Sequence, residues 1–142
     1  MSTSQQVRLL SAMSAVVLAC VATAVAEDPV TLENAVPVVI KTVPVAGSDD
    51  VDPALGQIQV TFSKPMRDGA WSWVQMSKES FPELQGDPKY LKDGRTCVVD
   101  VKLKPNQTYA IWLNSSKFQN FKDPQDRPAV PYFLVFKTGP GK

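Results

Sequence analysis

Residues 56–66 read GQIQVTFSKPM, with apolar side chains at Ile58, Val60 and Phe62 and mostly polar ones between them. A period of two places alternate side chains on opposite faces of an extended chain, so the pattern predicts a β-strand with one buried face. Pro65 ends this strand, because proline has no N–H to donate to a neighbouring strand. We expect the apolar trio to lie in the core of the domain.

Similar short runs, rich in β-branched and aromatic residues, recur along the chain between turn-forming residues. The dipeptide Asp93-Gly94 is a strong signal for a two-residue hairpin turn. Residues 77–89 contain two prolines and a glycine and are expected to be irregular, and residues 114–131 are expected to form a polar loop. Six or seven short strands without a helical period predict an all-β fold, an antiparallel β-sandwich. The predicted strands are residues 37–43, 57–63, 71–76, 96–103, 108–113 and 132–138.

The first 26 residues have the layout of a secretory signal peptide: one positive charge, an apolar stretch, and an A-x-A sequence that ends at Ala26. Cleavage there would leave 142 − 26 = 116 residues, with residues 27–36 as a tether and residues 37–139 as the domain. Two alternatives stay open. Seventeen apolar or small residues approach the roughly 20 of a retained membrane anchor, and the residues before Cys20 resemble a lipobox. We expect a secreted protein, periplasmic or extracellular, without a membrane span in its mature chain.

The predicted mature chain carries no net charge. Loss of Arg8 leaves 15 − 1 = 14 basic residues against 14 acidic ones. A neutral chain without a basic run offers no electrostatic footprint for nucleic acid, so no nucleic-acid partner is expected. Cys97 is then the one remaining cysteine, and its apolar neighbours predict a buried thiol. A reactive thiol beside the cationic Arg95 is the alternative.

Four segments carry motifs of a known family. Residues 44–53 have the pattern P-x-x-G…V-x-P, residues 60–66 end in F-S-x-P-M, residues 103–109 read L-x-P-N-x-T-Y, and residues 133–139 close with F-x-T-G. Together they resemble the bacterial Ig-like domains of the type found in the S-layer protein SbsA. One departure is residues 123–128, DPQDRP, where that family usually carries an Asp followed by Gly-Asn.

This resemblance covers residues 37–139. It implies an Ig-like antiparallel β-sandwich of about seven strands in a secreted or envelope protein, usually as a non-catalytic module, and it transfers no catalytic residue. Within such a sandwich, Tyr109 is expected to form a tyrosine corner, in which its hydroxyl bonds to backbone a few residues upstream.

The chain contains no histidine, which excludes a Ser-His-Asp triad, a Cys-His pair and zinc sites with histidine ligands. Glu79, Glu83 and Asp87 share one irregular loop and define the alternative function, a small secreted hydrolase, which needs two carboxyl groups held across a cleft. A solvated acidic loop is favoured over that alternative. Three aspartates in residues 49–52 lack the closing Glu of a calcium loop and are interpreted as turn formers. No metal or cofactor is expected.

Aromatic residues are the better functional lead. Trp71, Trp73, Tyr90 and Trp112 are predicted to form a flat platform, suited to stacking on sugar rings or anchoring a protein partner. The alternative is burial between the sheets, which is favoured for Trp73 and Trp112, whereas Trp71 is expected to be partly exposed. We therefore predict a non-enzymatic module that binds or spaces an envelope protein or polysaccharide at the cell envelope.

Overall fold

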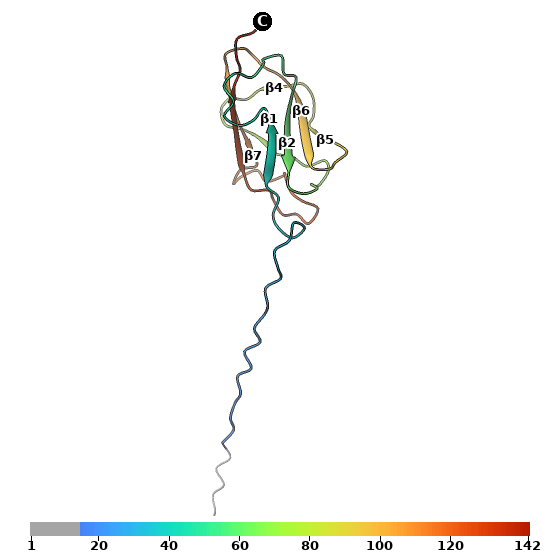
Figure 1. Cartoon of the computed structure of the whole chain (residues 1–142), viewed down its shortest axis with the longest axis vertical. Helices are drawn as coiled ribbons and strands as arrows, with labels where there is room; N and C mark the ends of the chain where they lie inside the picture. The colour runs from blue at the N-terminus through green and yellow to red at the C-terminus, as the bar shows by residue number, and fades with distance from the viewer. Residues whose placement is uncertain (1–14) are drawn as a thin grey trace, which may run out of the picture.

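Eight β-strands form two antiparallel sheets over residues 15–142, the part of the chain that the computed structural model describes (Figure 1). The strands are β1 (Val39–Val43), β2 (Gln57–Phe62), β3 (Trp73–Gln75), β4 (Glu83–Leu84), β5 (Lys89–Tyr90), β6 (Thr96–Lys102), β7 (Thr108–Leu113) and β8 (Tyr132–Lys137). One sheet has the order β1-β2-β6, and β4 and β5 both pair with the outer edge of β6. The other sheet has the order β3-β7-β8. The predicted all-β sandwich is confirmed.

β2 lies between β1 and β6 and supplies the centre of the core. Ile58, Val60 and Phe62 have no exposed surface, while the residues between them are only half-buried, as the period of two predicts. Full burial of a side chain of this size contributes roughly 1.5–3 kcal/mol. The strand and its buried face are therefore confirmed.

The hairpin at Asp93 and Gly94 exists, but its loop is longer than predicted. Leu91 donates its backbone N–H to the carbonyl of Thr96 at 2.8 Å, so four residues, 92–95, form the loop. A two-residue type I′ turn requires positive φ at both central residues. Gly94 has a positive φ (67°), but Asp93 does not. The Asp93 carboxylate accepts the backbone N–H of Thr96 at 3.0 Å.

Residues 71–90 differ from the prediction in two further ways. The predicted strand 71–76 is shortened to β3, which pairs with β7. Residues 77–89, expected to be irregular, contain β4 and the start of β5. Gly86, with φ 115°, lies between β4 and β5 and separates these two strands along the edge of β6. Strands of two residues show no period, so the sequence pattern could not reveal them.

β7 and β8 pair along their whole lengths, close to the predicted bounds. Tyr109, Ile111 and Leu113 are buried on one face of β7. The Tyr109 hydroxyl accepts a hydrogen bond from the backbone N–H of Lys104 at 2.8 Å, five residues upstream. The predicted tyrosine corner is confirmed.

The loop between β7 and β8 contributes to the core, although its sequence is mostly polar. Phe121 has no exposed surface, and its ring centroid lies 5.1 Å from that of Phe62. Asn114 is also fully buried. Its side-chain amide donates to the carbonyls of Phe121 (2.8 Å) and Ala129 (3.1 Å) and accepts the backbone N–H of Phe121 (2.9 Å). The buried Asn114 amide thus connects two parts of the loop, at Phe121 and at Ala129.

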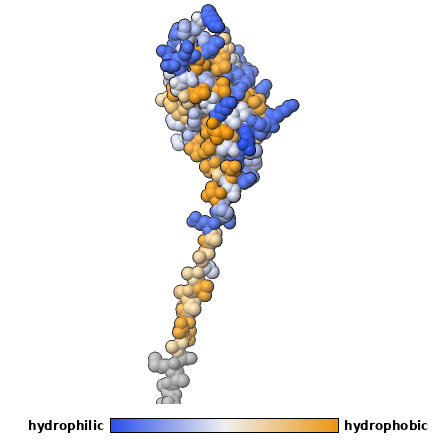
Figure 2. Space-filling model, viewed as in Figure 1, coloured by the Kyte–Doolittle hydropathy of each residue, from blue (hydrophilic) through white to orange (hydrophobic). Residues whose placement is uncertain are grey.

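Residues 15–30 have no regular secondary structure and extend away from the sandwich (Figure 1). Figure 2 shows their apolar side chains exposed along this tail, where Val16 keeps 83% of its surface. Residues 1–14, the first half of the predicted signal peptide, lie outside the described residues. Within residues 15–142, no helix is long and apolar enough to cross a membrane.

The end of the predicted tether is bound to the sandwich. The ammonium group of Lys64, a buried residue, donates to the carbonyl oxygens of Glu33 and Ala35, the latter at 3.2 Å. The Arg127 guanidinium donates to the carbonyls of Glu33 and Asn34. Both cations also contact the fully buried Asp123 carboxylate, at 2.9 and 2.8 Å. We call residues 33–35 the strap, and the three charged side chains the clamp.

Candidate ligand-binding groove

An open groove of about 420 Å³ lies between β3, the segment around β4, and the loop after β7. Its apolar surface comes from two half-buried tryptophans and from exposed Leu84 and Phe118. We call it the aromatic groove; its lining includes Trp71, Trp73, Leu84, Asp87, Phe118 and Asn120.

The register of β3 against β7 turns Trp73 toward the core. Trp73 pairs with Leu113, whose side chain is buried between the sheets, and directly opposite residues share a face. The Trp73 ring meets the ring of Phe121 edge to face, with centroids 5.7 Å apart and an interplanar angle of 70°. The core therefore anchors this indole from one side, while its remaining surface borders the groove.

Backbone hydrogen bonds hold Phe118 beside the tryptophans. Ser72, between the two indoles in sequence, accepts the backbone N–H of Asn120 with its hydroxyl at 2.9 Å. Its carbonyl accepts the backbone N–H of Asn114 at 3.1 Å. Phe118 itself donates its backbone N–H to the hydroxyl of Ser115 at 3.1 Å. Because these bonds fix the loop on both sides of Phe118, they place its backbone beside the groove, which its 49% exposed side chain lines.

Asp87 and Asn120 bring polar groups to the groove. Both residues are exposed, and over residues 15–142 neither side chain makes a hydrogen bond or an ion pair. A carboxylate and an amide beside aromatic rings can bond to the hydroxyl groups of a ring compound that stacks on the aromatics. The sequence analysis did not identify Phe118 and Asn120; the available signal was two phenylalanines, Phe118 and Phe121, inside a polar run.

Trp112 does not belong to this groove. It pairs with Val74, the neighbour of Trp73, so it projects from the opposite face of the β3-β7-β8 sheet. There its ring packs on Phe133, with centroids 4.9 Å apart. The predicted platform of four aromatic residues therefore divides, and only Trp71 and Trp73 line a common groove.

Tyr90 and Cys97 are directly opposite one another in β5 and β6 and belong to the interior. Tyr90 packs against the core and donates its hydroxyl to the carbonyl of Ala70 at 3.0 Å. Burial raises the pKa of the Tyr90 hydroxyl above its ordinary value and raises the pKa of the Cys97 thiol to about 12. The thiol is fully buried and stays neutral at physiological pH, so the reactive-thiol alternative with Arg95 is wrong.

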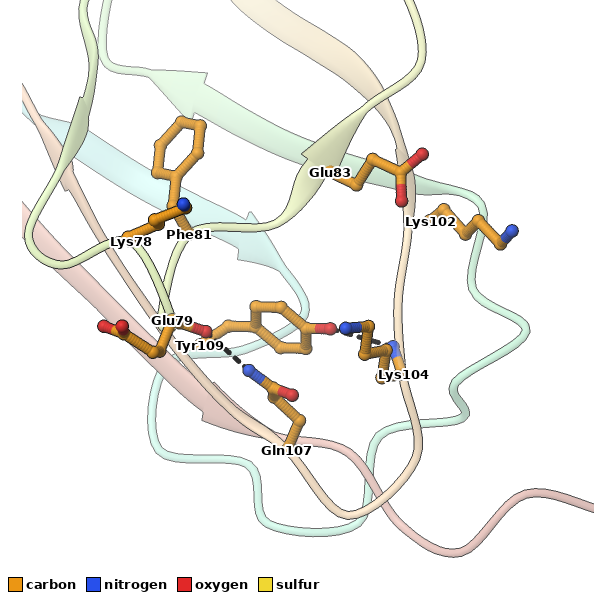
Figure 3. Close-up of a pocket in the computed structure, with 8 residues that line it drawn as sticks. All are labelled: Lys78, Glu79, Phe81, Glu83, Lys102, Lys104, Gln107 and Tyr109. Atoms are coloured by element: carbon orange, nitrogen blue, oxygen red, sulfur yellow. Dashed lines mark hydrogen bonds between the residues drawn. The ribbon is translucent and has the colours of Figure 1, made fainter.

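A second hollow, of about 440 Å³, lies under the loop that leads from β3 to β4 (Figure 3). The ring of Tyr109 crosses it, with the hydroxyl bonded to the backbone of Lys104. Glu79 and Glu83 border this hollow, but Asp87 lines the aromatic groove. The structure therefore does not bring together the three carboxylates named for a hydrolase.

The aspartates in residues 49–52 take part in a turn, as predicted. The Asp52 carboxylate accepts the backbone N–H of Ala54 at 2.9 Å. Among the described residues, 15–142, no three His, Cys, Asp or Glu side chains are grouped so that they could hold a metal ion.

Two antiparallel sheets around one core, with a tyrosine corner at the start of β7, define an immunoglobulin-like β-sandwich. The chain belongs to the family of bacterial Ig-like domains, whose family model matches residues 33–138. The resemblance found in the sequence motifs is thereby confirmed. The matched region includes the strap.

Similar solved structures include two of the S-layer protein SbsC. The crystal structure of rSbsC(31-844) has a TM-score of 0.47 and 17% identity, covering 74% of this chain and 14% of that chain. A structure of SbsC domains 1–6 has a TM-score of 0.41 and 18% identity, covering 75% of this chain and 14% of that chain. This chain thus spans a small part of those proteins. No curated protein matches it significantly.

Proposed function

We propose that this chain is a non-catalytic binding module of the bacterial cell envelope and that its aromatic groove binds a carbohydrate chain. The observation that carries the proposal is the pair Trp71 and Trp73, which line one open groove together with the free Asp87 carboxylate. Sugar rings offer an apolar C–H face to an indole and hydroxyl groups to polar side chains. The volume of about 420 Å³ lies within the roughly 300–1,000 Å³ of small-ligand sites.

The arrangement of carboxylates supports binding over hydrolysis. A glycosidase usually holds two carboxyl groups about 5–10 Å apart on either side of the scissile bond. Asp87 is the one carboxylate that lines the aromatic groove, while Glu79 and Glu83 border the second hollow. A sugar stacked on the tryptophans would therefore meet one carboxylate, which can position it by hydrogen bonding.

Family membership and the N-terminal segment support the envelope location. Bacterial Ig-like domains are the family of this chain, and the sequence up to Ala26 has the layout of a signal peptide. Residues 15–30 are exposed and lack secondary structure, which leaves the peptide bond after Ala26 open to a peptidase. The mature domain would then carry the groove outside the cytoplasmic membrane.

Tryptophan emission provides the test. The full chain is titrated with chitohexaose, cellohexaose and solubilised peptidoglycan, and at least one is expected to change the emission in a saturable way. Trp71→Ala should weaken that binding about tenfold, because an aromatic stacking contact contributes about 0.5–1.5 kcal/mol beyond its buried area. Trp112→Ala is the matched control, since it removes the same residue type from β7, on the sheet face opposite to that of Trp73 and outside the aromatic groove.

Two results would overturn the proposal. One is the absence of any saturable change with all three glycans, and the other is an equal loss of affinity in the two tryptophan variants. The same incubations, analysed for shortened glycans by mass spectrometry, address the hydrolase alternative. Shortened glycans that the natural chain produces, and that Glu79→Ala, Glu83→Ala or Asp87→Ala does not produce, would favour hydrolysis over binding alone.

A further inference from the structure

The aromatic groove offers few polar groups to a ligand. Of the residues that line it, Asp87 is the one with a charged side chain. The Ser72 hydroxyl is buried and already accepts the backbone N–H of Asn120 at 2.9 Å. The Nε1 atom of Trp73 is also buried, so this indole presents carbon atoms to the groove. The exposed side chains that can accept a hydrogen bond from a ligand are therefore those of Asp87 and Asn120.

The Asp87 carboxylate has no cation paired with it. Within residues 15–142, the ion pairs are formed by Asp123 and Asp126, each of which contacts two cations. A ligand that covers the Asp87 carboxylate removes water from a charged group, which costs free energy unless the ligand replaces the lost interactions. An ammonium group replaces them well, because it brings a positive charge and three N–H donors.

The aromatic rings favour the same charge. The faces of aromatic rings carry partial negative charge and attract a cation within about 6 Å of the ring centroid, most strongly for an indole. Trp71, Trp73 and Phe118 supply three such rings to the groove. Phe118 already makes this kind of contact, since the ammonium of Lys117 lies 5.6 Å from its ring centroid. The unpaired carboxylate and the rings therefore both favour a ligand that carries a positive charge.

A carbohydrate chain carries positive charge where it contains amino sugars whose amines are free. We propose that the aromatic groove selects such a chain, in which the amines are not acetylated. This inference rests on the proposed function, because it specifies the sugar that the groove prefers. A sugar ring stacks on the tryptophans, and its ammonium donates to the Asp87 carboxylate. Acetylation replaces the ammonium with a neutral amide that has one N–H, so the ion pair is lost.

Two hexasaccharides test the selection. The glucosamine hexamer and chitohexaose have the same backbone and length and differ in the acetyl groups on their amines. The full chain is titrated with each at about pH 6, where primary amines are charged, and tryptophan emission is followed. The glucosamine hexamer should bind about five- to tenfold more tightly, because charge-assisted hydrogen bonds are about twice as strong as neutral ones. In Asp87→Asn the ratio of the two affinities should fall to about one.

Glu83→Gln is the matched control. It removes the same charge from β4, where the side chain borders the second hollow and not the aromatic groove. The ratio of affinities should persist in this variant, because a general attraction between the chain and a polycation would respond equally to the loss of either carboxylate. Added salt should lower the ratio for the natural chain, since ions screen an exposed charge pair.

Three results would overturn this inference. They are equal affinities of the natural chain for the two hexamers, an unchanged ratio in Asp87→Asn, and an equal fall of the ratio in Asp87→Asn and Glu83→Gln. Saturable binding of both hexamers with equal affinity would leave the proposal of carbohydrate binding in place. No saturable change in emission with any of the glycans would overturn both.

Discussion

Replacing Asp123 with alanine should destabilise the domain more than any other single change of a charged residue. The Asp123 carboxylate has no exposed surface and accepts four hydrogen bonds. Two come from side chains, Lys64 at 2.9 Å and Arg127 at 2.8 Å, and two come from the backbone N–H groups of Gln125 (3.0 Å) and Arg127 (2.9 Å). Asp123→Ala leaves all four donors without this acceptor.

The magnitude follows from the burial of Lys64. Its side chain is 8% exposed, so the loss of Asp123 would leave this buried group without its counter-ion and with little access to water. Breaking a buried ion pair by removing one partner costs about 3–5 kcal/mol. The total stability of a domain is about 5–15 kcal/mol. Asp123→Ala should therefore remove a large part of the free energy of unfolding.

Urea unfolding followed by tryptophan emission measures the effect. With a loss of about 4 kcal/mol and an m-value of about 2 kcal/mol/M, the midpoint should fall by about 2 M. Asp126→Ala is the matched control, because Asp126 lies in the same loop and also contacts two cations, Arg67 and Lys122. Its side chain is 63% exposed, so its loss should cost only about 0–1 kcal/mol. Equal midpoints for the two variants would refute this account of the clamp.

Three further predictions concern pH, the tyrosine corner and the N-terminus. Burial alone would raise the pKa of the Asp123 carboxyl, but its bonds to Lys64 and Arg127 lower that pKa to about 2. The ionised Asp123 carboxylate should therefore stabilise the fold above about pH 4. The difference in the free energy of unfolding between the natural chain and Asp123→Asn should become smaller as the pH falls toward about 2. A difference that does not change with pH would contradict this. Tyr109→Phe removes the acceptor of the Lys104 N–H and should cost about 1 kcal/mol in urea unfolding, and no loss would count against the tyrosine corner. Mass spectrometry of the secreted protein should find Glu27 as the first residue, whereas a lipid on Cys20 would show anchoring.

Local patterns were sufficient where one strand carries the whole signal. The alternation of Ile58, Val60 and Phe62 identifies both the strand and its buried face, because period two links each residue directly to a face. The tyrosine corner was predicted from the resemblance to Ig-like domains, and it involves a short segment of chain, since the partner of Tyr109, Lys104, is only five residues away. Structural features that involve residues close in sequence can be predicted from a short segment of the chain.

Contacts between distant residues were not predictable in this way. Lys64 was seen as the end of a strand, but its ammonium is buried against Asp123, 59 residues away in the chain. The position of Trp112 on the opposite face from Trp73 depends on the register between β3 and β7, which neither strand encodes alone. Phe121 lies in a polar run. Its place in the core depends on the buried Asn114 side-chain amide, which bonds to the backbone carbonyl and N–H of Phe121.

The loop between β7 and β8 links the aromatic groove to the clamp. Its first part places Phe118 beside the tryptophans, and its last part supplies Asp123 and Arg127, which hold the strap. Phe121 lies between these parts, where Asn114 fastens it into the core. Because one core residue separates the two sites, a shift of Phe121 would disturb both the groove and the clamp. The position of Phe118 at the aromatic groove and the position of the clamp therefore both depend on the buried amide of Asn114.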